Sequence, residues 1–82
     1  MMKIQDLQNQ LDFYKVPKDA YSLRGGLPNE AFCIDFRDGQ WEVYYSERGS
    51  KTGLVSFKME EEACAYFFEW IIDTLKRMRI LE

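Results

Sequence analysis

Two acidic side chains, Asp35 and Glu42, carry the most evident chemistry in the sequence because a predicted hairpin sets them opposite each other. The Asp38-Gly39 pair between two alternating apolar runs is typical of a two-residue type I′ turn. Pairing residues outward from this turn places Asp35 across from Glu42, where like charges repel each other. Two interpretations stay open: Arg24 or Arg37 neutralises the pair from a diagonal position, or the carboxylates await a cation from another molecule.

No enzymatic role is expected for these carboxylates. Paired carboxylates perform acid–base chemistry in glycosidases, but these two would lie on an open sheet surface where nothing excludes water or shifts their pKa values. The sequence has no histidine, which is the commonest general base and metal ligand. Its two cysteines, Cys33 and Cys64, show no ligand spacing. We therefore predict a non-enzymatic protein with no catalytic residues, no metal site and no cofactor.

A tyrosine and a charged loop adjoin the carboxylate pair. Tyr44 is predicted to point away from the core, and charged residues follow it at positions 47, 48 and 51. In an isolated bend, pairing among these charges would be the usual explanation. Beside an exposed tyrosine, the same residue types are frequent in recognition sites, and loops on a rigid sheet commonly bind partners. The predicted partner-binding residues are Asp35, Glu42, Tyr44, Glu47, Arg48 and Lys51.

The composition indicates a globular domain and limits its partners. The 82 residues form one predicted domain, 1–82, and an apolar fraction of 46% is ample for a core. Eleven basic and fourteen acidic residues give a net charge of -3, so nucleic acid is an unexpected partner and a basic protein surface a better one. There is neither an apolar run of the ~20 residues that span a bilayer nor a signal-like start. We expect a cytoplasmic protein with no membrane association.

Helical spacing marks both ends of the chain. Apolar residues at positions 4, 7, 11 and 14 predict a first helix that ends near Lys15, because Pro17 disfavours helical geometry at the residue before it. A wider apolar stripe predicts a second helix within residues 58–82, with acidic residues at its start and basic ones at its end, as the helix dipole favours. Tyr66 and Trp70 flank this stripe, and they either widen the buried face or form an exposed aromatic patch.

Short strands fill the middle of the chain. A strand near Tyr21 precedes a reversal at residues 25–29, and a further strand covers residues 53–57. In the central hairpin every apolar position falls on one side, which is predicted to be the core side: Phe32, Ile34, Phe36, Trp41, Val43 and Tyr45. The predicted fold is α+β with two layers: a helix, a three- to four-stranded antiparallel meander, and a second helix, with both helices on one sheet face. The opposite sheet face is expected to be open.

The chain resembles small bacterial immunity proteins of polymorphic toxin systems. The points of likeness, in order over residues 21–71, are YSL-x-GG-x-P, W-E-V-Y-Y-x-E-R-G-x-K and F-x-x-E-E-x-A. The resemblance implies a protein that binds a cognate toxin domain in the producing cell and blocks it, and leaves the identity of that toxin open. It carries over the signature positions Glu42, Tyr44, Glu47, Arg48, Gly49 and Lys51. The alternative is a general interaction domain, or a homodimer joined through sheet edges or the Tyr66–Trp70 flank.

Overall fold

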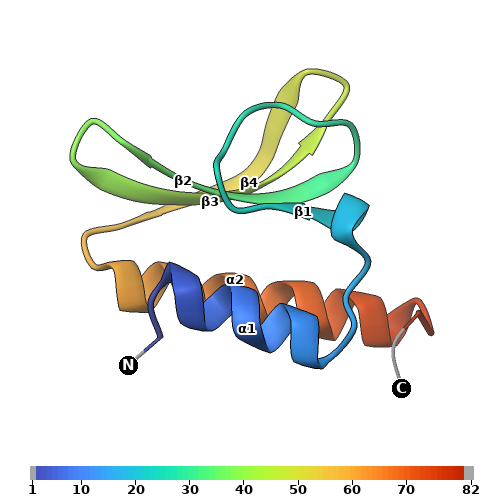
Figure 1. The fold of residues 1–82 in the computed structure, drawn as a ribbon. Coiled ribbons are helices and arrows are strands. Elements are labelled where there is room, and N and C mark those ends of the chain that lie inside the picture. The colour runs from blue at the N-terminus through green and yellow to red at the C-terminus, as the bar shows by residue number, and fades with distance from the viewer. Residues whose placement is uncertain (1, 81–82) are drawn as a thin grey trace.

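A four-stranded sheet and two helices form two layers in the computed structural model of the protein, which describes residues 2–80 (Figure 1). Both helices cover one face of the sheet, so the predicted α+β two-layer architecture is confirmed; residues 1, 81 and 82 of the predicted domain and final helix lie outside the described range. Within residues 2–80, every helix is too short or too polar to span a bilayer. The elements are α1 (Ile4–Phe13), the 3₁₀ turn η1 (Lys18–Ala20), β1 (Tyr21–Ser22), β2 (Ala31–Arg37), β3 (Gln40–Glu47), β4 (Ser50–Phe57) and α2 (Glu60–Arg77).

The predicted hairpin register is confirmed at every position. Strands β2 and β3 are antiparallel, and Asp35 pairs with Glu42 as the turn position required. Asp38 and Gly39 have φ angles of 51° and 79°, the left-handed pair of a type I′ turn. An acidic residue followed by glycine tolerates this geometry well, so the local sequence and the pairing agree.

A second hairpin, which the sequence analysis treated as a loop, joins β3 to β4. Arg48 and Gly49 have φ angles of 51° and 77°, and Glu47 pairs with Ser50 across them. Strand β4 therefore begins three residues earlier than predicted. Its register with β3 shifts at Tyr44, because Gly53 and Leu54 together oppose that single residue in a β-bulge. In the order β1-β2-β3-β4, β4 is an edge strand.

The first strand differs from the expected meander. Tyr21 and Ser22 of β1 run parallel to β2, pairing with Phe32 and Cys33, so the sheet is mixed. A reversal directly after β1 would have made this pair antiparallel. Instead the segment Leu23–Glu30 leaves the plane of the sheet on the side away from the helices and returns to start β2 beside β1 (Figure 1).

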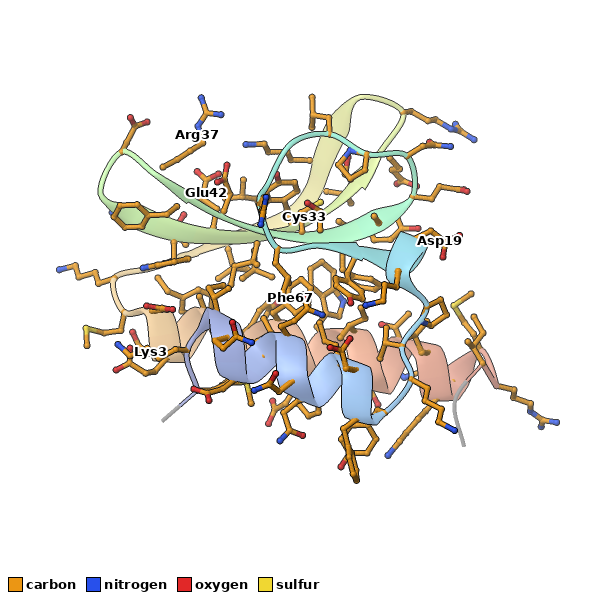
Figure 2. All side chains as sticks on the ribbon, viewed as in Figure 1. Lys3, Asp19, Cys33, Arg37, Glu42 and Phe67 are labelled. Carbon is orange, nitrogen blue, oxygen red and sulfur yellow. The ribbon has the colours of Figure 1, made fainter. Side chains whose placement is uncertain are left out.

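The core lies between the layers, as Phe67 shows in Figure 2. Of the hairpin residues predicted to face inward, those nearest to α2 belong to this core. The buried members of the core are Leu7, Leu11, Val16, Phe32, Ile34, Val43, Ala63, Cys64, Phe67, Ile71 and Leu75. The prediction fails toward the hairpin tip, where Phe36 is 55% exposed and Trp41 is half-buried. Those two rings pack on each other, with centroids 5.0 Å apart, at the hairpin end that reaches past the helices.

The two helices run parallel and are tied together where they begin (Figure 1). The Ile4 N–H of α1 donates to the Glu60 carboxylate of α2 at 2.8 Å, and the Lys3 ammonium lies 3.3 Å from the Glu61 carboxylate. The acidic start of α2, predicted to serve its own dipole, therefore also caps α1. At the other end of α2, the Ile80 N–H donates back to the Leu75 carbonyl, which closes the helix.

Candidate functional site

The sheet face opposite the helices is covered in part, around Cys33 and Tyr44, and is not fully open as predicted. The segment Leu23–Glu30 crosses it, and the Tyr44 hydroxyl donates a hydrogen bond of 2.7 Å to the carbonyl of Gly26 in that segment. Tyr44 is therefore fully buried, as is Cys33 beside it. The prediction that Tyr44 points away from the helices was correct, but the prediction that it is exposed was wrong, because the chain itself supplies a third layer of contact at this place.

Glycine permits the close approach of this segment to the sheet. Gly25 has a φ of +71°, and its N–H donates to the Ile34 carbonyl at 3.0 Å. A Cβ atom at Gly25 would lie 2.3 Å from the Asp35 Cγ and 2.8 Å from its Cβ. Asp35, predicted to be exposed for a partner, is instead half-buried under this backbone, and its carboxylate accepts the N–H of Phe36 at 2.9 Å.

Glu42 has an internal cationic partner that neither interpretation of the carboxylate pair named. The Lys51 ammonium of β4 lies 3.3 Å from the Glu42 carboxylate and 4.7 Å from the centroid of the Tyr44 ring. The Lys51 side chain is only 27% exposed and the Glu42 side chain only 20%, so water screens this ion pair less than at an open surface. Lys51 of β4 thus neutralises the carboxylate, in place of Arg24 or Arg37.

The remaining two predicted residues lie at the β3–β4 turn. The Thr52 hydroxyl lies 3.5 Å from the Glu47 carboxylate, at the limit of a hydrogen bond, across the base of the turn. Arg48 occupies the first turn position and is exposed. In Figure 1 this hairpin and the Leu23–Glu30 segment both rise from the sheet face away from the helices, the same side on which Figure 2 shows Glu42 and Arg37.

Together these contacts define one surface with a buried support. We call it the loop–hairpin surface; its accessible or partly accessible members are Arg24, Leu27, Glu42, Glu47, Arg48 and Lys51. Tyr44 is the support, because its hydroxyl holds the loop while its ring lies under the Lys51 ammonium. Four of the six predicted site residues, at positions 35, 42, 44 and 51, are brought together around this ring or under the loop. Glu47 and Arg48 stand at the adjoining turn.

Leu27 and the two glycines that lay the loop on the sheet were not predicted to belong to the site. Leu27 is 53% exposed at the outer side of the loop, next to the Gly26 carbonyl that Tyr44 holds. The Gly25-Gly26 pair was interpreted only as a reversal. A signal was present: Cys33 and Tyr44 put apolar surface on the supposedly open face, and such residues favour a cover.

Burial sets the acid–base behaviour of the support. Burial raises the pKa of Tyr44 from 10.0 to about 12, with smaller contributions from the nearby Cys33, Asp35 and Glu42. Burial likewise raises the pKa of the Cys33 thiol, and that of Cys64 to about 12. Cys64 faces the core from α2, while Cys33 lies on the other side of the sheet, as predicted, so both are buried thiols without thiolate character at neutral pH.

The late ionisation of Tyr44 gives a measurable result. The folded state holds the phenolic proton more tightly than the unfolded state, so this contribution to stability is fully present below pH 10 and is lost as pH rises toward about 12. In a phenolate absorbance titration, Tyr44→Phe is expected to remove the latest transition, while Tyr14→Phe, at an exposed ring, leaves it in place. If the transition survives Tyr44→Phe, the loop does not cover this ring.

No protein-family model matches this chain, and no curated protein or solved structure matches it either.

Proposed function

We propose that this protein is a non-enzymatic binding module of the immunity type, which binds a bacterial toxin domain through the loop–hairpin surface and neutralises it. The sequence resemblance supplies the role, and its signature positions, from Glu42 to Lys51, fall in or under this surface. The group of Glu42, Tyr44 and Lys51 supports binding over catalysis, because each polar group there already has an internal partner. A paired, rigid arrangement of this kind suits recognition.

The proposal rests mainly on the backbone conformation and the exposed side chain of Arg48. It has a φ of 51°, a backbone position at which asparagine, aspartate or glycine is favoured and most side chains are strained. Its side chain is exposed and forms no hydrogen bond or ion pair with any residue in the range 2–80. Arginine at this position therefore adds no hydrogen bond or ion pair to the hairpin within residues 2–80. A residue that costs local stability without an internal contact is typical of a functional surface, and arginine is frequent at the centres of interfaces.

The loop gives the surface its second feature, a fixed apolar contact. The Ser22 hydroxyl donates to the Gly25 carbonyl at 2.9 Å, and the Tyr44 hydroxyl holds the next carbonyl. Leu27 therefore projects from a segment whose backbone is already ordered. Because such a loop loses little conformational entropy on binding, a modest contact area yields useful affinity.

Co-expression tests the role directly. The toxin to test is the carboxy-terminal domain of any large secreted protein that is encoded directly upstream of this chain. We expect cells that express that domain to grow when this protein is present and to stop growing without it. A purified pair should form a stoichiometric complex. Equal loss of growth with and without this protein would refute the proposal.

Arg48→Asn separates recognition from folding. Asparagine suits the left-handed turn position, so the free energy of unfolding should rise by about 0.5–1 kcal/mol. If Arg48 is an interface residue, the same change should weaken toxin binding about tenfold or more, measured by calorimetry. The matched control is Asp38→Asn at the equivalent position of the β2–β3 turn, which should leave binding unchanged. Unchanged binding in the Arg48 variant would remove this residue from the interface.

Self-association is a second candidate, favoured by the exposed face of α2. A shallow hollow of about 530 Å³ there is lined by Tyr66, Phe68, Trp70 and Ile72 together with charged residues. Tyr66 is 37% exposed, which favours a contact with another molecule. Trp70 is also part of the fold itself, because its ring packs on Phe32 with ring centroids 4.9 Å apart. A homodimer through this face would leave the loop–hairpin surface free. In that case the Arg48 variant would have no effect on function, which distinguishes the two candidates.

A further inference from the structure

A pocket opens between the two layers where β2 begins and α2 ends, on the helix side of the sheet. Its volume is about 470 Å³, within the range of small-ligand sites, which is roughly 300–1,000 Å³. Its apolar walls come from both layers: Phe32, Tyr45, Leu75, Met78 and Ile80. The Phe32 and Tyr45 rings meet edge to face, with centroids 5.0 Å apart. Ile80 is placed at the pocket by the hydrogen bond that closes α2.

Two acidic side chains and no basic one are among the lining residues of this end pocket. Asp19 and Glu30 line it, both are exposed, and neither forms an ion pair with a residue that the structure describes. The neighbouring cations do not neutralise them: Lys18 and Arg79 are not lining residues, and the Lys18 ammonium lies 3.3 Å from Asp12. The pocket therefore combines an apolar interior with carboxylates at its rim.

The raised pKa of Tyr45 also indicates a negative electrostatic potential at this pocket. Burial raises the pKa of this phenol, and the negative charges of Glu30 and Glu47 raise it further. A potential that disfavours a phenolate favours a cation at the same place.

We propose that the end pocket binds an organic cation that carries an apolar chain, an alkylammonium in chemical class. The chain would lie against the walls from β2, β3 and α2. The ammonium would lie between the Asp19 and Glu30 carboxylates and near the Phe32 and Tyr45 rings, which attract cations to their faces. This binding site is separate from the proposed toxin-binding role and does not depend on it.

Three probes of equal chain length test the charge preference. Hexyltrimethylammonium stays charged at every pH, hexanol is neutral and hexanoate is an anion. In an NMR titration of the full chain, we expect the cation to bind most tightly and the anion least, with amide shifts concentrated at Tyr45, Thr74 and Leu75. The bound cation should also lower the pKa of Tyr45 toward its ordinary value, an effect that Tyr45→Phe removes from the absorbance titration.

Glu30→Gln tests whether the rim charge contributes to cation binding. The Glu30 side chain is exposed, so the fold does not depend on its charge. Loss of one partly exposed carboxylate should weaken hexyltrimethylammonium binding by about threefold to fivefold. Asp38→Asn, which removes one charge at the β2–β3 turn, is the control and should leave this affinity unchanged.

Several results would overturn the proposal. Equal affinity for hexanoate and hexyltrimethylammonium would mean that the pocket recognises only apolar chains. Shifts centred on Tyr66 and Trp70 would place the ligand in the α2 hollow instead. Binding of a leucine–lysine peptide without binding of any free ammonium would indicate a protein segment as the occupant. None of these outcomes bears on toxin binding, which the co-expression experiment measures separately.

Discussion

Phe67→Ala is expected to lower the free energy of unfolding by about 4 kcal/mol, the largest loss for a single side chain in this fold. Phe67 is fully buried between α2 and the sheet, and its removal leaves a cavity that the rigid layers cannot close. A chain of this length has a total stability of roughly 4–12 kcal/mol. Urea denaturation followed by circular dichroism should therefore show a strongly lowered unfolding midpoint, and a wild-type stability at the low end of that range would leave the variant unfolded.

The matched control is the same substitution at the hairpin tip. Phe36 is 55% exposed, so Phe36→Ala removes little buried surface and mainly the contact with the Trp41 ring. A loss of about 1 kcal/mol is expected there. Similar losses at both positions would contradict the assignment of the core to the space between the layers, and would show that the hairpin tip is covered in solution.

Gly25→Ala is expected to cost about 3 kcal/mol, although it adds one methyl group at the surface of the sheet. Two effects add: a φ of +71° strains any L-residue, and the new Cβ would lie 2.3–2.8 Å from three atoms of Asp35. The Asp35 Cβ is fixed to its strand, so a change of rotamer cannot relieve the contact. The loop must lift, and the hydrogen bond from Tyr44 to Gly26 is then lost.

Gly49→Ala separates strain from steric contact. Gly49 has a φ of +77°, but nothing lies within 4 Å of an added Cβ, so only the backbone cost of about 1 kcal/mol is expected. A double-mutant cycle completes the test, because Asp35→Gly removes all three contacted atoms and should recover much of the excess loss in Gly25→Ala. Equal losses for Gly25→Ala and Gly49→Ala would mean that the loop does not lie on the sheet.

The sequence predicted the parts of the fold that local chemistry decides. Asp38-Gly39 predicted the register of the first hairpin, and the alternation on both sides of it predicted which face turns toward the helices. Helical spacing together with Pro17 predicted the end of α1 to within two residues. In each case one short motif has few compatible geometries, so composition and position are sufficient.

The parts that were missed depend on contacts between distant segments. Arg48-Gly49 forms the same turn as Asp38-Gly39, but arginine seldom takes the first position, so nothing in the residue type indicated a hairpin. The cover over Tyr44 requires Gly26, 18 positions away, to reach its hydroxyl. Likewise the Lys51 partner of Glu42 follows only once the second hairpin is known. The six residues of the predicted site lie in and around the two hairpins, and the exposure of Tyr44 and Asp35 was predicted wrongly.

The bulge at Gly53–Leu54 has a consequence for how copies of this protein meet. An outer strand of eight residues would normally offer its free amide and carbonyl groups to any extended chain and so invite aggregation. Here the extra residue bends the strand and leaves only three regular positions on each side, 50–52 and 55–57. The bent edge strand is therefore a poor template on which an extended chain could add a fifth strand.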